Sequence, residues 1–229
     1  MQEELIQKAA GTLPAQHAVT PKRPRGQERQ QALIEAGLQL TASRRWSEVT
    51  VSDIAQAIGC SVGTFYTRFH NKEAYFAVLQ QLLAEVLQQR LDAFHAAPER
   101  EGETPAQFLQ AWVGLMVHSF RLHRGLYAAA LGQTQQPPRD ANTAHPLAQL
   151  RLVTRGRLVA AMARWPQWQG EAAAARLGFA HQMLHGLLVS AVLTDPGPVR
   201  LGDDALVTQT AEALGAYLGI VPVHKDNQP

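Results

Sequence analysis

Basic side chains gather in one N-terminal segment of this 229-residue chain, where their charge could attract phosphate groups. The segment from Lys22 to Lys72 contains eight lysines and arginines but only four aspartates and glutamates. The segment from Glu73 to Pro229 contains twelve basic and thirteen acidic residues. The formal charge of the whole chain is only +2, so the total charge indicates no class of partner. A local basic excess is typical of segments that bind nucleic acid, but small charge biases are also common on solvated surfaces.

Helices must position these basic side chains, and capping signals predict two short helices in a row. Thr50 can cap a helix that carries Asp53 in its first turn, and Gly59 can end that helix. Ser61 can then cap a third helix that runs through Phe69. Two short helices joined by a tight turn with glycine form a helix-turn-helix unit, although helical hairpins also occur in proteins that bind no DNA.

A longer helix is predicted on each side of this unit. The first spans about residues 27–43, and Trp46 is expected to pack on its apolar face, which consists of Leu33, Ile34, Gly37, Leu38 and Thr41. The fourth helix is capped by Asn71, carries Glu73 in its first turn and spans residues 71–94. The pattern of the three N-terminal helices buries Ile54, Ala55, Ile58, Phe65 and Phe69. It leaves outward positions for Val62, Thr64, Tyr66, Thr67 and Arg68.

The segment from Leu33 to Tyr75 resembles the N-terminal domain of the tetracycline-repressor (TetR) family of regulators. The residues that match the family pattern are, in order, Thr50, Ile54, Ala55, Gly59, Ser61, Gly63, Thr64, Phe65, Tyr66, Phe69, Lys72 and Glu73. The resemblance implies an all-α fold with an N-terminal three-helix DNA-binding domain and a helical C-terminal domain for ligand binding and dimerisation. It implies a DNA-binding transcriptional regulator, typically a repressor that a small-molecule effector releases from a palindromic operator.

Three departures from the family pattern concern packing rather than the DNA-facing positions. Arg45 stands where the family often has glycine, so the turn there must either avoid a positive φ or strain Arg45. Thr41 replaces a usual aromatic residue, and the neighbouring Trp46 is a candidate to fill that space. Ile58 replaces a common alanine near the turn.

The resemblance also implies roles for individual side chains at DNA, with the helix that begins at Ser61 entering the major groove. Gly63 would allow close approach to the sugar-phosphate wall, and hydroxyl groups would bind phosphates or base edges. Arg68 would pair with phosphate or guanine, and Lys72 with phosphate at a helix start. The candidate DNA-binding residues are Thr50, Ser52, Ser61, Val62, Gly63, Thr64, Tyr66, Thr67, Arg68 and Lys72.

The chain is expected to divide into five parts. They are a flexible basic N-terminal arm (residues 1–25), a helix-turn-helix domain (26–72), a connecting helix (73–95), a C-terminal effector-binding and dimerisation domain (96–221) and a tail (222–229). The basic end of the arm, Lys22 to Arg25, could reach into a minor groove or remain a solvated tail. Both interpretations stay open at this point.

The C-terminal region is predicted to be helical near residues 105–122, 125–134, 147–165, 171–194 and 203–218. In the TetR family the last two long helices form the dimer interface. Small residues permit close packing on both of them here, namely Ala180, Gly186, Ser190, Ala191, Ala211, Ala213 and Gly215. Small residues also occur in helices that form no interface, so the homodimer is an expectation from the family.

Large apolar and polar side chains in the same region are candidates for an effector site. Apolar walls would supply burial, while arginine and histidine would orient a polar or anionic group. The candidates are Trp112, Met116, His118, Arg121, Phe179, His181, Met183 and His185. Plain core packing explains the apolar members as well. His181 and His185 lie four residues apart and could ligate a metal, but without a neighbouring carboxylate or cysteine they are weak evidence for one.

No catalytic or phosphate-cradling motif was found, so we expect neither an enzyme nor a bound cofactor. The single cysteine, Cys60, rules out an internal disulfide, and no apolar run reaches the ~18–20 residues of a membrane span. A cytoplasmic location follows as an expectation. The expected partners are double-stranded DNA, a second copy of the chain and a small-molecule effector. The alternatives are a helical interaction module that binds no DNA and a metal-responsive regulator.

Overall fold

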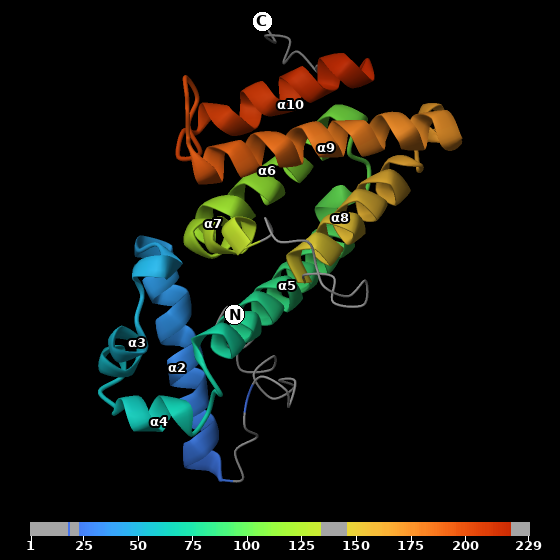
Figure 1. Ribbon diagram of the computed structural model, residues 1–229. Helices are drawn as coiled ribbons and strands as arrows, with labels where there is room; N and C mark the ends of the chain where they lie inside the picture. The colour runs from blue at the N-terminus through green and yellow to red at the C-terminus, as the bar shows by residue number, and fades with distance from the viewer. Residues whose placement is uncertain (1–17, 19–22, 134–145, 221–229) are drawn as a thin grey trace, which may run out of the picture. The chain divides into compact units, whose positions relative to one another are not determined.

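The computed structural model describes residues 18, 23–133 and 146–220, and in these ranges the chain is helical with no β-strand. The helices are α2 (Pro24–Ser43), α3 (Val51–Ala57), α4 (Val62–Tyr66), α5 (Lys72–Ala96), α6 (Pro105–Leu122), α7 (Arg124–Gln133), α8 (Pro146–Met162), α9 (Glu171–Leu193) and α10 (Ala205–Leu218) (Figure 1). The predicted all-α fold is confirmed. Most of the predicted N-terminal arm and the tail at 222–229 lie outside the described residues.

The chain packs into two compact units. Unit 1 comprises Met1–Arg90 and His123–Leu150, and unit 2 comprises Leu91–Leu122 and Arg151–Pro229. Unit 1 therefore includes α7, which packs against α2, although the sequence assigned residues 96–221 to one C-terminal domain. The compact units are defined by packing and the expected domains by function, so the functional division remains a prediction.

The core of unit 1 is built where α2 and α5 approach closely. The hydroxyl of Tyr75 on α5 donates a hydrogen bond to the carbonyl of Leu33 on α2, and both side chains are fully buried. A Cβ atom added to Gly37 would lie only 2.0 Å from the Tyr75 hydroxyl oxygen, so this approach requires a residue without a side chain. Phe65 and Phe69 pack on Tyr75 with ring centroids 5.2 and 4.7 Å apart. This contact fixes the turn after α4 against α5.

The structure corrects one packing prediction for unit 1 and adds to another. Trp46 is buried and stacks on Phe76 of α5 with ring centroids 4.7 Å apart, so α5 supplies a contact that the sequence did not predict. Ile58 is half-buried rather than buried, since it ends α3 at the edge of a pocket.

Arg45 has φ −67°, so the turn after α2 uses no positive φ and carries no strain at this residue. Thr41 is buried, and its hydroxyl donates to the Gly37 carbonyl at 2.9 Å.

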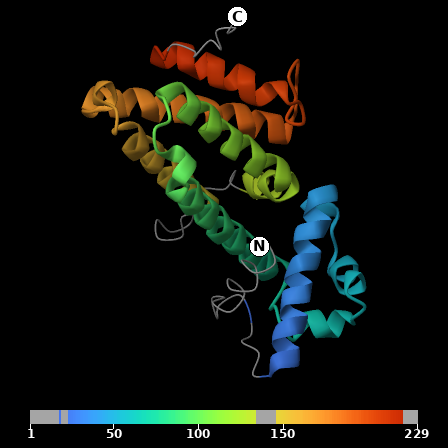
Figure 2. The same cartoon turned by 180° about the vertical axis from the view of Figure 1, so that it is seen from behind.

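Unit 2 is organised around α6, α9 and α10, which lie side by side (Figure 1 and Figure 2). Helix α6 has the residue bounds that were predicted, and α9 and α10 differ from theirs by one or two residues. A cluster of aromatic rings fills the interior. The ring centroid of Trp112 lies 5.8 Å from that of Phe94 and 6.3 Å from that of Phe108. Among the helices that the structure describes, none is long and apolar enough to cross a membrane.

Candidate nucleic-acid interface

Reciprocal capping fixes the start of α3. The Thr50 hydroxyl accepts from the Asp53 backbone N–H at 3.1 Å, while the Asp53 carboxylate accepts from the Thr50 N–H at 2.7 Å. The Thr50 hydroxyl and backbone stabilise the charged carboxylate, with help from Arg44, and lower the pKa of Asp53 to about 2. The predicted capping box is confirmed. Asp53 is therefore ionised at neutral pH and holds the first turn of α3 in place.

The turn from α3 into α4 follows the predicted signals. Gly59 follows the C-cap residue of α3, Ile58, and adopts φ +65°, a left-handed conformation that favours glycine. The Ser61 hydroxyl then accepts from the Thr64 N–H at 3.2 Å and caps α4. Below the turn, Phe65 is fully buried and anchors α4 to the core. The helix ends at Tyr66, three residues earlier than the sequence suggested, because Thr67 and Arg68 form a turn and Phe69 pairs with Ala18 in an isolated bridge.

One side of α4 faces outward with side chains that can contact DNA. Tyr66 is 52% exposed and Val62 40% exposed, while Ser61, Gly63 and Thr67 are also exposed. The Thr67 hydroxyl donates to the Thr64 carbonyl at 2.7 Å, so its oxygen can still accept a hydrogen bond and its methyl remains free. A Cβ added to Gly63 would meet only the Ser61 hydroxyl, at 3.7 Å. Packing within the chain therefore does not require glycine at this exposed position.

Lys72 has an internal partner that the sequence did not reveal. Its ammonium group donates to the Trp46 carbonyl at 3.0 Å and lies 4.6 Å from the centroid of the Trp46 ring. These contacts tie the start of α5 to the turn after α2. An ammonium group has three N–H donors, so Lys72 can still bind a phosphate. Thr50 and Ser52, the other predicted anchors, are exposed at the start of α3.

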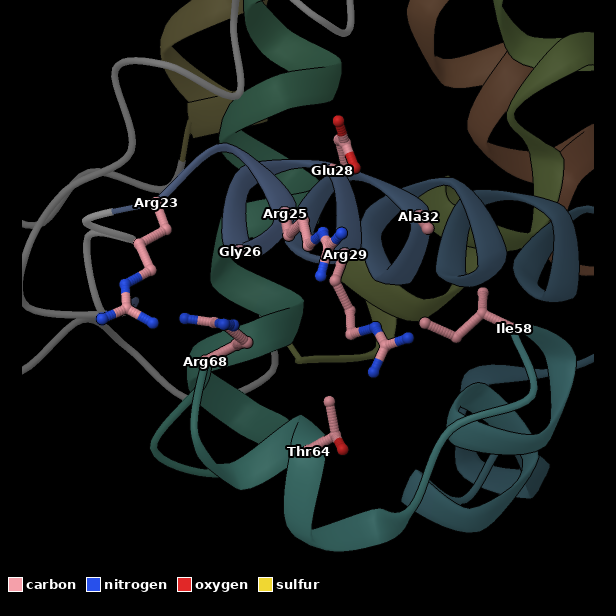
Figure 3. A pocket seen from close by; sticks show the side chains of 9 residues that line it. All are labelled: Arg23, Arg25, Gly26, Glu28, Arg29, Ala32, Ile58, Thr64 and Arg68. Atoms are coloured by element: carbon pink, nitrogen blue, oxygen red, sulfur yellow. The ribbon is translucent and has the colours of Figure 1, made fainter.

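A basic pocket lies between α2 and α4, and sequence reasoning missed part of it. The open pocket has a volume of about 900 Å³ (Figure 3), and we call it the basic pocket; its lining residues are Arg23, Arg25, Gly26, Glu28, Arg29, Ala32, Ile58, Thr64 and Arg68. Figure 3 shows Arg29 extending from α2 toward α4, while Glu28 points the other way. Arg29 was not among the predicted site residues. Its spacing of four from Arg25 on one helix was the available signal.

The basic pocket divides the predicted contacts of α4 into two groups. Thr64 and Arg68, four residues apart, line the basic pocket and are half-buried, whereas Tyr66 and Val62 face outward. The Arg68 Nε atom is buried and has no hydrogen-bond partner among the described residues. The arginines of the basic pocket form no ion pair with any carboxylate in the described part of the chain. Within the described residues, the positive charge of the pocket is therefore not paired with a carboxylate.

The structure brings together some of the predicted effector residues in unit 2 and separates others. Trp112, Met116 and His181 are buried, and Met183 and His185 are half-buried. His118 is exposed and Phe179 is 49% exposed, so neither belongs to the interior. Arg121 donates to the carbonyls of Leu201 and Asp203, which fastens the loop before α10.

Buried ring nitrogens without partners mark the interior of unit 2. The Thr154 hydroxyl donates to the Arg151 carbonyl at 3.0 Å, so it must accept from His181 Nε2, 3.2 Å away. This places the proton of His181 on Nε2 and leaves Nδ1 as a bare acceptor. His181 Nδ1 and the indole N–H of Trp112 are buried, and neither has a partner among the described residues. The ring centroids of Trp112 and His181 lie 6.5 Å apart, so an acceptor and a donor are left unused close together.

Burial also determines the charge of these histidines. Desolvation, followed by the positive charge of Arg151, lowers the pKa of His181 to about 4. The same two causes lower the pKa of His185 to about 4. Both rings are thus neutral at pH 7. No group of three or more metal-ligating side chains occurs in the described ranges.

The sequence and the fold of this chain are similar to those of known bacterial regulators. Residues 33–79 match the family described as "Bacterial regulatory proteins, tetR family". The HTH-type transcriptional regulator EthR of Mycolicibacterium smegmatis is 23% identical over 88% of this chain and 91% of its own length. EthR of Mycobacterium tuberculosis is 29% identical over 47% of this chain, and the match spans 49% of that regulator. A tetR-family regulator from Streptomyces coelicolor has the same fold (TM-score 0.64, 20% identity, covering 84% of this chain and 81% of the other). Residues 33–79, from α2 into the start of α5, thus carry the helix-turn-helix domain typical of tetR-family bacterial transcriptional regulators, and the chain is similar to such regulators over most of its length.

Proposed function

We propose that this regulator is a homodimeric repressor that binds a palindromic operator through α4 and is released by a small molecule. The observation that carries the DNA-binding part is the exposed side of α4. It presents Tyr66, the bare backbone of Gly63 and, directly after the helix, Thr67, while the Ser61 cap and the buried Phe65 hold α4 in place. Such a short helix reads only a few base pairs, so a second reader related by two-fold symmetry would complete the site.

Exposed apolar side chains on the last two helices support the homodimer. Phe179, Leu187 and Leu193 of α9 and Tyr217 of α10 are between 38% and 51% exposed, all within unit 2. Several of the small residues that pointed to this face, including Ala191 and Gly215, are buried within the chain itself. The proposed interface therefore rests on the large apolar residues together with the exposed Gly186, Ser190 and Ala213.

The unpartnered nitrogens of unit 2 support an effector site. A ligand that donates to His181 Nδ1 and accepts from the Trp112 N–H would satisfy both groups, which are costly to leave unpaired. The two histidines are neutral and Arg151 contributes positive charge, so a cationic ligand is disfavoured. We propose an effector with adjacent hydrogen-bond donor and acceptor groups and no positive charge. Because its target is chromosomal DNA, we place the regulator in the cytoplasm.

Selection of bound duplexes from a random pool tests the DNA-binding part of this proposal. Wild-type protein should enrich an inverted repeat, and a duplex that carries one half of that repeat should bind much more weakly. Enrichment of a single unrepeated site would contradict the dimeric reader, while absence of any enrichment would favour a helical interaction module. For the effector, a thermal-shift screen of uncharged and anionic compounds should yield ligands whose effect is lost in Trp112→Phe.

A further inference from the structure

Among the described residues, the basic pocket gathers four arginines and a single glutamate, and Arg23, Arg25 and Arg29 are exposed to solvent. Arg23 directly precedes α2, Arg25 and Arg29 lie in its first two turns, and Arg68 comes from the opposite wall. The single acidic lining residue, Glu28, points away from the pocket in Figure 3. Like charges gathered in one pocket repel each other, and a buried unpartnered guanidinium nitrogen, such as Arg68 Nε, is costly. An anion in the pocket would relieve both costs.

The chemistry of the pocket selects phosphate. A guanidinium group presents paired N–H donors that match the oxygens of a phosphate, and Thr64 adds a hydroxyl on the same wall as Arg68. The pocket is open rather than enclosed, which suits a strand that passes through it. Thr64 and Arg68 also lie on or directly after the helix that we propose enters the major groove. The wall of that groove is the sugar-phosphate backbone.

We infer that the basic pocket holds the DNA phosphodiester backbone beside α4, so that the first two turns of α2 form a second DNA-binding element that reads no base. This inference rests on the proposed DNA binding of α4. It assigns Arg29 as an anchor, with Arg23 and Arg25 beside it, and gives Arg68 a phosphate rather than a guanine as its partner. It also makes the footprint of each subunit wider than the bases that α4 can touch.

Binding of Arg29→Ala to DNA at several salt concentrations tests the inference. Alanine is the best helix former, so the substitution in α2 should leave folding intact, which thermal unfolding will verify. We expect the variant to bind the selected operator and an unrelated duplex more weakly by the same factor, on the order of tenfold, and the salt slope to fall by about one. Arg29→Lys keeps the charge and should recover part of the slope. Arg200→Ala removes the same charge from an exposed position in unit 2 and should bind as wild type.

Neutral methylphosphonate linkages, placed one at a time along the operator, locate the contact. Wild-type protein should lose affinity at a small number of positions, and at least one of these losses should vanish in Arg29→Ala. Exchange of A·T for G·C pairs next to the half-site should leave the effect of Arg29→Ala unchanged. Replacement of chloride by inorganic phosphate at constant ionic strength should leave wild-type affinity for the operator unchanged, because the pocket binds a strand rather than a free ion.

Three results would overturn the inference while leaving the proposed function in place. They are wild-type affinity and salt slope in Arg29→Ala, a methylphosphonate profile that this variant does not change, and a penalty that depends on the flanking base pairs, which would indicate minor-groove reading. Competition by free phosphate in wild type but not in Arg29→Ala would show a small-anion site instead. If wild-type protein itself prefers no duplex, the proposed function fails first.

Discussion

Gly63→Ala should increase the stability of the folded protein and weaken its binding to DNA. Gly63 is the second residue of α4, and an added Cβ would meet only the Ser61 hydroxyl, at an ordinary contact distance of 3.7 Å. Its φ is not positive, so alanine fits without strain. Replacement of glycine by alanine at such a position stabilises a protein by about 0.4–1 kcal/mol, because the unfolded chain loses conformational freedom. Urea unfolding should therefore show a more stable variant.

The same methyl group should weaken operator binding, because it projects from the surface that we place against the sugar-phosphate wall. One extra methyl in a closely packed contact typically costs about 1–3 kcal/mol, which is roughly five- to 150-fold in affinity. Fluorescence anisotropy with a labelled operator measures this loss. A folding defect cannot explain weaker binding by a more stable protein.

Gly59→Ala is the matched control for this prediction. Gly59 lies four residues earlier at φ +65°, where a side chain costs about 1–2 kcal/mol of stability, although there is open space around it. This variant should lose stability and bind the operator normally once correction is made for the folded fraction. If Gly63→Ala binds the operator as tightly as wild type, α4 does not approach DNA as closely as we reason.

Three further predictions follow from other contacts. Lys72→Ala should lower the salt slope of DNA binding by about one, because a phosphate contact is lost. It should also lower the melting temperature, because the hydrogen bond to the Trp46 carbonyl is lost. An unchanged salt slope would leave Lys72 with a structural role only. Leu187→Glu, at a 42% exposed position of α9, should give monomers in sedimentation velocity without unfolding, and dimers of this variant would place the interface elsewhere. The pKa values of His181 and His185 are lowered from 6.5 to about 4, so between these pH values the unfolded chain binds more protons than the folded one. Stability should therefore fall as the pH is lowered from 7 to 5, and His181→Gln with His185→Gln should flatten this dependence in urea unfolding; an unaltered pH profile would contradict the buried neutral pair.

Local signals made much of unit 1 predictable. The capping box of Thr50 and Asp53, the glycine after α3 and the serine cap of α4 each involve residues within three or four positions, and the structure has all of them. The helical period likewise placed Phe65 and Phe69 in the core. These features depend on nearest neighbours along the chain, which a sequence displays directly.

Features that depend on how helices rotate and pack were not predictable in the same way. The period of a helix does not say which neighbour each face meets, so Phe179 and His118 could be assigned to an interior although they are exposed. Arg29 joins Arg68 in one pocket only because α2 crosses near α4, some forty residues later in sequence. Trp46 rests on α5 for the same reason.

The most direct test of the central claim, that the outward side of α4 contacts DNA, is the operator affinity of Tyr66→Phe compared with Tyr217→Phe. Both substitutions remove one phenol hydroxyl from an exposed tyrosine, the first on α4 and the second on α10 of unit 2. We predict that Tyr66→Phe weakens binding by roughly 1–3 kcal/mol, or about five- to 150-fold, since a hydrogen bond to a charged phosphate is lost. Because Tyr217 also lies in the proposed dimer interface, affinities are compared at concentrations where sedimentation shows both variants to be dimers, and there Tyr217→Phe should bind as wild type does. Equal affinities for wild type and Tyr66→Phe, with the fold intact, would contradict the orientation of α4 on which the account depends.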